Sequence, residues 1–374
     1  MSATISRREM LHDLLAAGMV LGAGWPALAQ GEELIPFTDL NLGPNARVPP
    51  NLATYFTDND AFFAVQHYPV PPPIDPASYK LRITGLVEKP MELTLATLRA
   101  RPRVEEVVAF ECSGNNNARG NPLLGNARWT GTSVAQLLKE ARPRPTAREI
   151  VFFGADTGTE EITHGGAPEK VEQHFGRGMA IDDATRPEVM LAYEMNGQPM
   201  PHPHGAPVRL VVPGWYGVAN VKWLNHIHVQ DSRFMGRFMA RDYVTLRGES
   251  VGDTTVWNET SVSRIRLKSA IGRITRMGAA VKATGFALTD GTGLKAVEVK
   301  VDDGPWKPAV LDKRNTRYSW QLFTYEWTGA QPGEHTIVSR ASDTRGEVQP
   351  IEEDLRGKKT RWENNGQFVR KFKI

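Results

Sequence analysis

Cys112 is the first residue to consider for chemistry, because it is the only cysteine in 374 residues. A lone thiol cannot form an intrachain disulfide, and free cysteines are most often small buried hydrophobic residues. Here the thiol follows the apolar run 107–110 and precedes a loop rich in glycine and asparagine. That order predicts the end of a strand, where the backbone can lie close to a ligand. A soft thiolate at such a position favours metal ligation over packing.

Other polar residues suit a cofactor that carries a phosphate and a polar ring. Arg209 offers a planar fork of donors, and Lys222 offers a point charge. Gly214 and Gly217 permit a close approach of the backbone. These residues belong to four stretches: 62–67 (FFAVQH), 110–115 (FECSGN), 204–209 (HGAPVR) and 213–224 (PGWYGVANVKWL).

Each of these side chains also has an ordinary structural interpretation. His67 and His204 lie near prolines and could be loop histidines, while Arg209 and Lys222 could be surface charges. The two histidines of segment 226–228 alternate on one predicted strand, but no third metal ligand lies nearby in the sequence. We therefore interpret that histidine pair as structural.

Together, the four stretches resemble the sulfite oxidase family of molybdenum-pterin oxidoreductases. The segment 191–199 is also similar, so the resemblance runs over residues 50–345. It implies that Cys112 ligates molybdenum and that a molybdopterin cofactor lies against the four stretches. The residues that it implies at this cofactor are Phe63, Gln66, His67, Asp156, His204, Arg209, Asn220, Val221 and Lys222.

The resemblance also bears on substrate binding. Tyr243 matches the family's tyrosine beside the metal, although a tyrosine packed at a domain junction is the alternative. Val65 stands where animal and plant sulfite oxidases have an arginine, and the arginines close behind the family's cysteine are missing too. An oxyanion needs positive charge in its pocket, so we predict that Arg119 and Arg241 bind the substrate.

The N-terminus predicts an export signal. Residues 1–29 contain the pair Arg7-Arg8, then an uncharged stretch, then an Ala-Leu-Ala cleavage pattern at 27–29. A membrane anchor is the alternative, but the apolar stretch is short and contains several glycines. We expect a twin-arginine signal, a periplasmic protein and no membrane span after processing.

Two domains are expected from the length and from a change of pattern near residue 255. Residues 30–254 mix predicted strands and short helices and are expected to form an α+β molybdopterin-binding domain. Residues 255–374 alternate short strands and turns, which predicts an immunoglobulin-like sandwich for dimerisation. The strands predicted most clearly are 79–87, 105–110, 150–153, 208–213, 221–230, 280–286, 296–301, 318–323 and 335–340; the predicted helices are 93–98 and 132–138.

The expected function is therefore oxidation of sulfite to sulfate by oxygen-atom transfer. No C-x-x-C-H haem signature occurs, so we expect no haem, an external c-type cytochrome as electron acceptor, and a homodimer. The formal charge of only +3 gives no argument for nucleic-acid binding. Two alternatives remain: a same-family enzyme acting on sulfane sulfur or on an S- or N-oxide, and a non-catalytic interaction module. A haem-linked nitrate reductase would need electron-transfer domains that this length does not accommodate.

Overall fold

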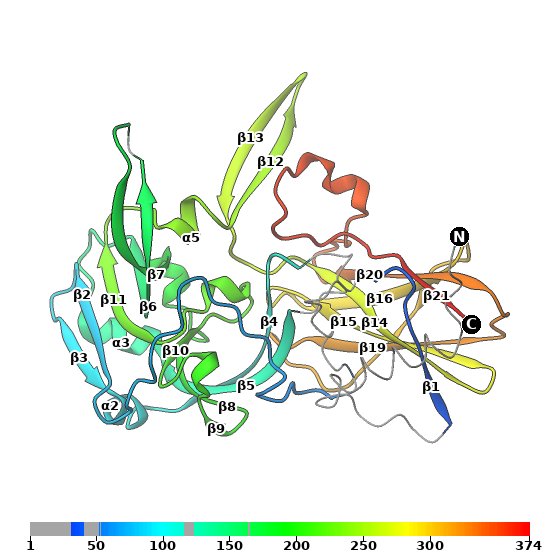
Figure 1. The fold of residues 1–374 in the computed structure, drawn as a ribbon, viewed down its shortest axis with the longest axis horizontal. Coiled ribbons are helices and arrows are strands. Elements are labelled where there is room, and N and C mark those ends of the chain that lie inside the picture. The colour runs from blue at the N-terminus through cyan, green and yellow to red at the C-terminus, as the bar shows by residue number, and fades with distance from the viewer. Residues whose placement is uncertain (1–30, 41–51, 53, 116–122, 164) are drawn as a thin grey trace, which may run out of the picture.

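The computed structural model describes residues 31–40, 52, 54–115, 123–163 and 165–374, and strands dominate it (Figure 1). The predicted export signal 1–29 lies outside these residues. Within the described ranges, no helix is long and apolar enough to cross a membrane. The helices are short, as the predicted mixture of strands and short helices implies.

One five-stranded sheet has the order β3-β2-β11-β6-β7, and only the β2–β11 pair is parallel. Leu81 and Ile83 alternate with outward-facing residues and are fully buried, as a half-buried strand requires. The register of β6 and β7 shifts between Phe153 and Thr157. The strands of this sheet are β2 (Lys80–Gly85), β3 (Met91–Thr94), β6 (Glu149–Ile162), β7 (Glu169–Ala180) and β11 (Leu224–Gln230).

A second, antiparallel sheet has the order β10-β8-β5-β4, with β9 paired to β8. Trp129 and Phe110 stack in its core with their ring centroids 4.8 Å apart. Cys112 follows β4 directly, as the sequence predicted. The strands are β4 (Val104–Glu111), β5 (Leu124–Ser133), β8 (Met190–Met195), β9 (Gln198–Pro199) and β10 (Arg209–Val211).

Short helices connect these strands. Both predicted helices are present. Thr94 forms a capping box at the start of one, and the Ser133 hydroxyl accepts a hydrogen bond from a backbone amide in the first turn of the other. The α-helices are α2 (Leu95–Arg99), α3 (Val134–Ala141), α4 (Ile181–Ala184) and α5 (Arg237–Ala240); the 3-10 helices are η2 (His202–His204), η3 (Gly217–Ala219) and η4 (Glu352–Gly357).

Strands β12 (Val244–Val251) and β13 (Thr254–Ser261) form a two-stranded hairpin that projects from the body of the molecule (Figure 1). The expected domain boundary at residue 255 falls inside this hairpin. The chain enters the next sheet only at Lys268, so the change from one group of sheets to the other lies between Ser261 and Lys268.

The later part of the chain forms two antiparallel sheets, ordered β1-β14-β15-β19-β18 and β17-β16-β20-β21. Their inner faces share one buried cluster, so they pack as a two-layer sandwich. Residues 32–35, which lie in a proline-rich part of the sequence and were not predicted as a strand, pair with β14. The strands are β1 (Glu32–Ile35), β14 (Lys268–Met277), β15 (Ala280–Leu288), β16 (Leu294–Val301), β17 (Lys307–Pro308), β18 (Val310–Leu311), β19 (Gln321–Thr328), β20 (Glu334–Asp343) and β21 (Arg370–Lys373).

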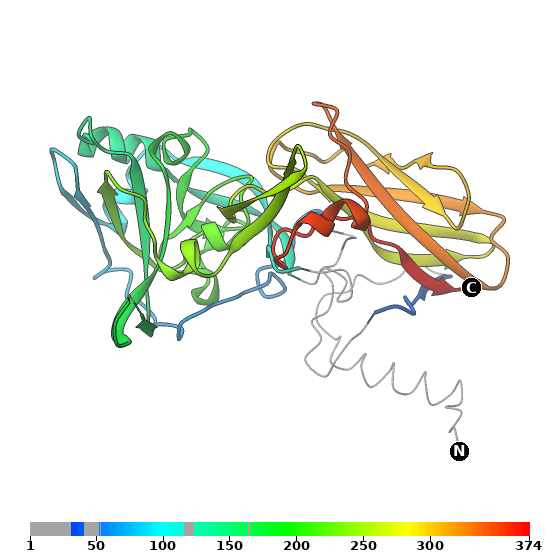
Figure 2. The same cartoon turned by 90° about the horizontal axis from the view of Figure 1, so that it is seen from above.

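The two groups of sheets meet along a packed junction (Figure 2). Tyr216 from the first group and Trp320 from the second belong to the same buried hydrophobic cluster. The segment between β20 and β21 also lies at this junction, and there the Glu363 amide donates to the Ser113 carbonyl at 2.8 Å. The second group of sheets therefore reaches the loop that carries Cys112.

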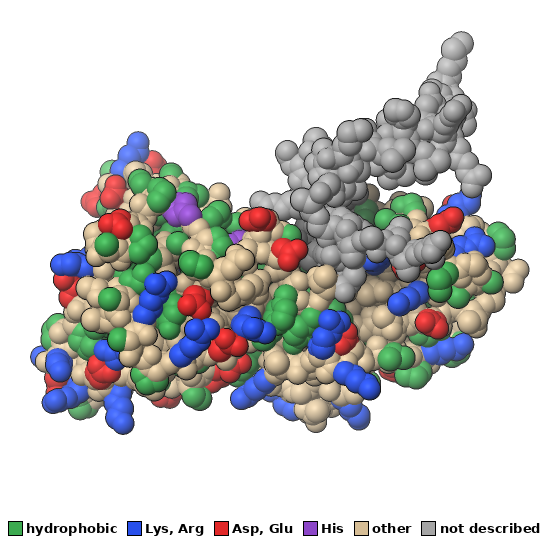
Figure 3. All heavy atoms as spheres, turned by 90° about the horizontal axis from the view of Figure 1, so that it is seen from below, with side chains coloured by type: hydrophobic (Ala, Val, Ile, Leu, Met, Phe, Trp, Pro, Cys, Tyr) green, Lys and Arg blue, Asp and Glu red, His purple; other side chains and the backbone are tan. Residues whose placement is uncertain are grey.

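Basic and acidic side chains are intermixed on the described face seen from below in Figure 3. That distribution agrees with the small formal charge and provides no extended basic surface on this face.

Candidate active site

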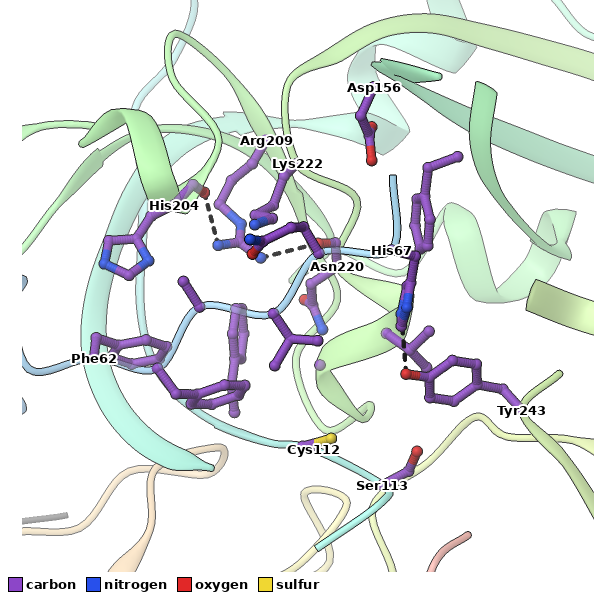
Figure 4. A pocket seen from close by; sticks show the side chains of 18 residues that line it. Phe62, His67, Cys112, Ser113, Asp156, His204, Arg209, Asn220, Lys222 and Tyr243 are labelled. Atoms are coloured by element: carbon purple, nitrogen blue, oxygen red, sulfur yellow. Dashed lines mark hydrogen bonds between the residues drawn. The ribbon is translucent and has the colours of Figure 1, made fainter. Parts of the chain in front are cut away.

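A cavity in the first group of sheets brings together nearly all of the predicted site residues (Figure 4). Its walls come from segments 62–67, 110–113, 204–209 and 217–222, together with one residue each from β6, β7 and the position before β12. Its lining residues are Phe62, Phe63, Ala64, Val65, Gln66, His67, Phe110, Cys112, Ser113, Asp156, Phe175, His204, Arg209, Gly217, Val218, Asn220, Lys222 and Tyr243.

Cys112 is placed by the end of strand β4. Its amide donates to the Leu123 carbonyl at 3.0 Å, and its carbonyl accepts from the Asn115 amide at 3.0 Å in the turn that follows. The thiol is free of any disulfide and partly exposed, and its sulfur points into the cavity (Figure 4). The neighbouring Ser113 hydroxyl is buried without a hydrogen-bond partner. This edge of the cavity thus presents a soft thiol beside an unsatisfied hydroxyl.

Across the cavity, the Tyr243 hydroxyl lies 3.0 Å from Nε2 of His67. Stacked rings of Phe175 and Phe238 flank the imidazole. The side chain of His67 is still exposed to solvent on one side, yet desolvation by these neighbours lowers its pKa to about 4. His67 is therefore neutral at pH 7, and its Nε2 shares one hydrogen bond with the tyrosine hydroxyl.

Tyr243 is held in an unusual backbone conformation. Its φ is +60°, a region in which a bulky residue costs on the order of 1 kcal/mol or more. Trp362 stacks on its ring at a centroid distance of 4.2 Å, and burial is the main cause that raises its pKa. The hydroxyl therefore stays protonated and fixed in direction.

At the opposite end of the cavity, His204, Arg209 and Asn220 brace the backbone. The Arg209 guanidinium donates to the carbonyls of His204 and Asn220 at 2.8 and 2.9 Å. The Asn220 side chain accepts from the Val212 amide and donates to the Tyr216 carbonyl. Burial lowers the pKa of His204 to about 4, so its neutral ring donates through Nε2 to the Asn59 carbonyl at 2.7 Å. These hydrogen bonds hold the backbone that forms this end of the cavity in one conformation.

Gly205 shows how closely two of these segments approach. Its φ is +109°, and a Cβ at this position would lie 2.9 Å from the Cα of Lys222. Only glycine accommodates both the backbone angle and this contact. The stretch 204–209 therefore lies directly against the segment that carries Lys222.

Lys222 and Asp156 provide the charge at this end. Desolvation lowers the pKa of Lys222 to about 7, and its ammonium donates to the Pro203 carbonyl at 3.1 Å. Desolvation also raises the pKa of Asp156 to about 6, and its Oδ1 is buried without a hydrogen-bond partner. Asp156 lies in the register shift between β6 and β7, where a bulge re-aims a side chain. A partly buried lysine and an unsatisfied carboxyl suit a polar anion that also carries N–H donors.

These residues fit a molybdenum-pterin group. The single thiol is a soft ligand for the metal, the Asp156 carboxyl can accept from a pterin N–H group, and Lys222 can pair with a phosphate.

Several predicted residues lie elsewhere. Arg241 is exposed and does not line the cavity, so the structure does not bring it to the site. Val221 is fully buried behind the wall rather than part of the lining. Arg119 lies outside the described residues. The histidines 226 and 228 share Thr84 as a hydrogen-bond partner, and no metal-binding cluster of three or more ligands occurs in the ranges that the structure describes.

Three neighbours of the site were not predicted from the sequence. Ser113 and Phe175 line the cavity, and Trp362 stacks on Tyr243 from the second group of sheets. Arg361 stacks on Trp362 and lowers the pKa of Tyr243, which places an additional cation near the cavity. The spacing of the motifs around Cys112 does not predict that Arg361 and Trp362, from the C-terminal part of the chain, pack near the cavity.

Comparisons with known proteins agree with this cavity. The family model for the oxidoreductase molybdopterin binding domain matches residues 67–238. Sulfite oxidase of Gallus gallus is 33% identical over 336 residues, which cover 82% of this chain and 71% of the relative. Mitochondrial sulfite oxidase of Rattus norvegicus is 31% identical and is matched over 60% of its length. The chain thus spans about 60% of the mammalian relatives that it matches.

A solved structure has the same fold. The crystal structure of the sulfane dehydrogenase SoxCD from Paracoccus pantotrophus superimposes with a TM-score of 0.72 at 24% sequence identity. The match covers 86% of this chain and 84% of that chain, so the shared fold extends over both groups of sheets.

Proposed function

The chain belongs to the sulfite oxidase family of molybdenum-pterin oxidoreductases, and we propose that it oxidises sulfite to sulfate and passes the electrons to an external acceptor. One observation carries the proposal: the only thiol of the chain opens into the cavity that also contains Lys222 and the unsatisfied carboxyl of Asp156. A bound molybdenum-pterin group would supply two-electron redox chemistry and oxygen-atom transfer at this place.

Residues of the chain itself would bind the metal, the pterin and the substrate. Cys112 would ligate the metal, while Lys222 and Asp156 would bind the polar ends of the pterin. The Tyr243 hydroxyl would accept a hydrogen bond from the Nε2–H tautomer of His67 and donate its single proton to an oxygen of the substrate, while Trp362 holds the ring in place. Arg361 would add positive charge for an anionic substrate at the Tyr243 side of the cavity.

A second candidate is oxidation of sulfane sulfur by the same cofactor. Val65 supports it, because this apolar side chain lines the cavity where animal and plant sulfite oxidases have an arginine. An apolar wall at that point suits a less strongly charged sulfur group better than sulfite. The two candidates share cofactor and ligands and differ only in the substrate.

Location, partner and assembly belong to the same proposal. The twin-arginine pattern within residues 1–29 supports export to the periplasm after folding. A c-type cytochrome is the proposed acceptor, since the single cysteine provides no haem attachment motif. The two-layer sandwich that follows the hairpin, which we propose to be immunoglobulin-like, is the proposed surface for a homodimer.

The test is an assay on protein of known molybdenum content. Sulfite should reduce ferricyanide or cytochrome c at a rate proportional to bound molybdenum. A thiol-bound sulfane substrate is the matched comparison. Full molybdenum loading with turnover of the sulfane compound alone would replace the first candidate by the second, and a purified protein without molybdenum would contradict both.

A further inference from the structure

The hydrogen-bonded pair His67 and Tyr243 has chain neighbours that are also connected to each other. Tyr68 follows His67, and its hydroxyl donates to Oε1 of Glu160 at 2.8 Å. Asp242 precedes Tyr243, and its Oδ2 accepts from Nε of Arg237 at 2.8 Å. Both neighbours therefore reach side chains on other elements, Glu160 on β6 and Arg237 on α5.

Arg237 closes the connection. Its NH1 group donates to Oε2 of Glu160 at 2.5 Å, while its Nε serves Asp242. Glu160 is only 4% exposed, so its carboxylate is fixed within the protein and needs both partners. We call the sequence Tyr68–Glu160–Arg237–Asp242 the outer chain, because it runs beside the inner contact between His67 and Tyr243.

We propose that Arg237 is a positioning residue: by bridging Glu160 and Asp242 it aligns the segment of His67 with the segment of Tyr243, so that the tyrosine hydroxyl meets the imidazole. The role in turnover rests on the proposed function above, whereas the alignment rests on geometry alone.

The requirement for a bridge follows from the backbone of Tyr243. Its φ of +60° is a conformation that a tyrosine rarely adopts unless its surroundings impose it. The amide of Asp242 donates to the Arg237 carbonyl at 2.7 Å, so backbone and side chain of Arg237 both act on the residue before Tyr243. A planar guanidinium can serve two carboxylates in one orientation, which a lysine cannot do.

The charges around His67 provide an independent readout. The carboxylate of Asp242 raises the pKa of His67, and the cations Lys222 and Arg237 lower it. The other groups that pack on the imidazole are the Tyr243 hydroxyl and the rings of Phe175 and Phe238. Removal of Arg237 and removal of the Asp242 charge should therefore shift the pKa of His67 in opposite directions, although both break the same ion pair.

The experiment compares Arg237→Met and Asp242→Asn in the full chain, matched for molybdenum content and labelled with ¹⁵N-histidine. Tyr243→Phe identifies the His67 signal without its hydrogen bond. Both variants should move the ring-nitrogen signal toward that of Tyr243→Phe, Arg237→Met should raise the pKa of His67, and Asp242→Asn should lower it. Loss of orientation should reduce kcat/KM by about 10- to 100-fold.

Arg233→Met is the matched control. Arg233 also pairs with a buried glutamate of β6, Glu149, at 3.1 Å, but that pair makes no contact with the outer chain. It should lower the melting temperature to a similar extent while leaving the His67 signal unchanged. An unchanged His67 signal in Arg237→Met, or an equal change in Arg233→Met, would overturn the positioning role. Altered His67 signals with undiminished turnover would instead contradict the role of the pair in the proposed function.

Discussion

The Lys268 ammonium lies 2.6 Å from Oε1 of Glu111, and both side chains are only 1% exposed. This buried ion pair joins β14 of the second group of sheets to the residue directly before Cys112. Breaking one partner of such a pair leaves an uncompensated charge in the protein interior, which usually costs more than replacing both partners by apolar residues.

Glu111→Gln and Lys268→Met should therefore each lower the free energy of unfolding by about 3–5 kcal/mol. The double variant Glu111→Met with Lys268→Met should be less unstable than either single change, because no charge is left unpaired. Chemical denaturation of the three proteins measures this order. Additive losses in the double variant would show that the two charges do not depend on each other.

Cys112→Ser should retain the fold and lose molybdenum. A serine oxygen is a harder ligand than a thiolate, and the serine hydroxyl is not ionised at neutral pH. Even changes to residues behind metal ligands cost about 10- to 100-fold in affinity or activity. We expect turnover to fall by more than about 100-fold with a melting temperature close to that of the unchanged protein. Metal analysis and thermal unfolding check both statements, and an active serine variant would exclude Cys112 as the ligand.

Lys222→Met should reduce the bound cofactor by about 10-fold or more, because it removes the partly buried ammonium that suits a phosphate. Quantification of molybdenum and of released pterin tests this expectation. Lys139→Met, at an exposed position of α3, is the control and should bind as much cofactor as the unchanged protein. Equal cofactor content in both variants would place the phosphate elsewhere.

The neutral His204 predicts how stability depends on pH. Its pKa is lowered by burial to about 4 from an ordinary value near 6.5, so the unfolded chain binds the proton more readily between these values. The stabilisation is complete above about pH 6.5 and is lost as the pH falls toward 4, on the order of 3 kcal/mol for this 5% exposed residue.

His204→Gln should therefore lose less stability than the unchanged protein between pH 6.5 and 4. Asp156 acts in the opposite sense, because its pKa is raised by burial to about 6 and its contribution is lost as the pH rises through that value. For this reason the measurement is the difference between the two proteins at each pH, obtained by urea unfolding. If the difference in unfolding free energy between the two proteins is the same at every pH, the pKa of His204 does not differ between the folded and the unfolded state.

The sequence predicted the parts of the fold that have local signals. Alternating apolar residues indicated β2, and the apolar run 107–110 indicated the end of β4. The helices α2 and α3 correspond to the predicted helices 93–98 and 132–138. Strand β1 was not predicted, because its four residues become a strand only through pairing with the distant β14. The hairpin of β12 and β13 was missed as well, since β13 and the end of β12 are exposed on both faces and show no alternation.

The site was predicted where motifs carry the residues and was incomplete where tertiary contacts bring them in. His67, Cys112 and Lys222 are embedded in patterned stretches, and all three line the cavity. Arg241 was predicted as a source of positive charge for an anionic substrate, but its side chain is exposed and does not line the cavity. Trp362 could not be inferred, because only the packed junction brings it onto Tyr243.

The position of Trp362 has a consequence for biosynthesis. The ribosome completes Cys112, His67 and Tyr243 well before it reaches this tryptophan, so a nascent chain has the ligand residues but not the ring that stacks on Tyr243. A cofactor delivered to an unfinished chain would bind before Trp362 packs on Tyr243. The ring that packs on Tyr243 therefore becomes available only after residue 362 has been added to the chain.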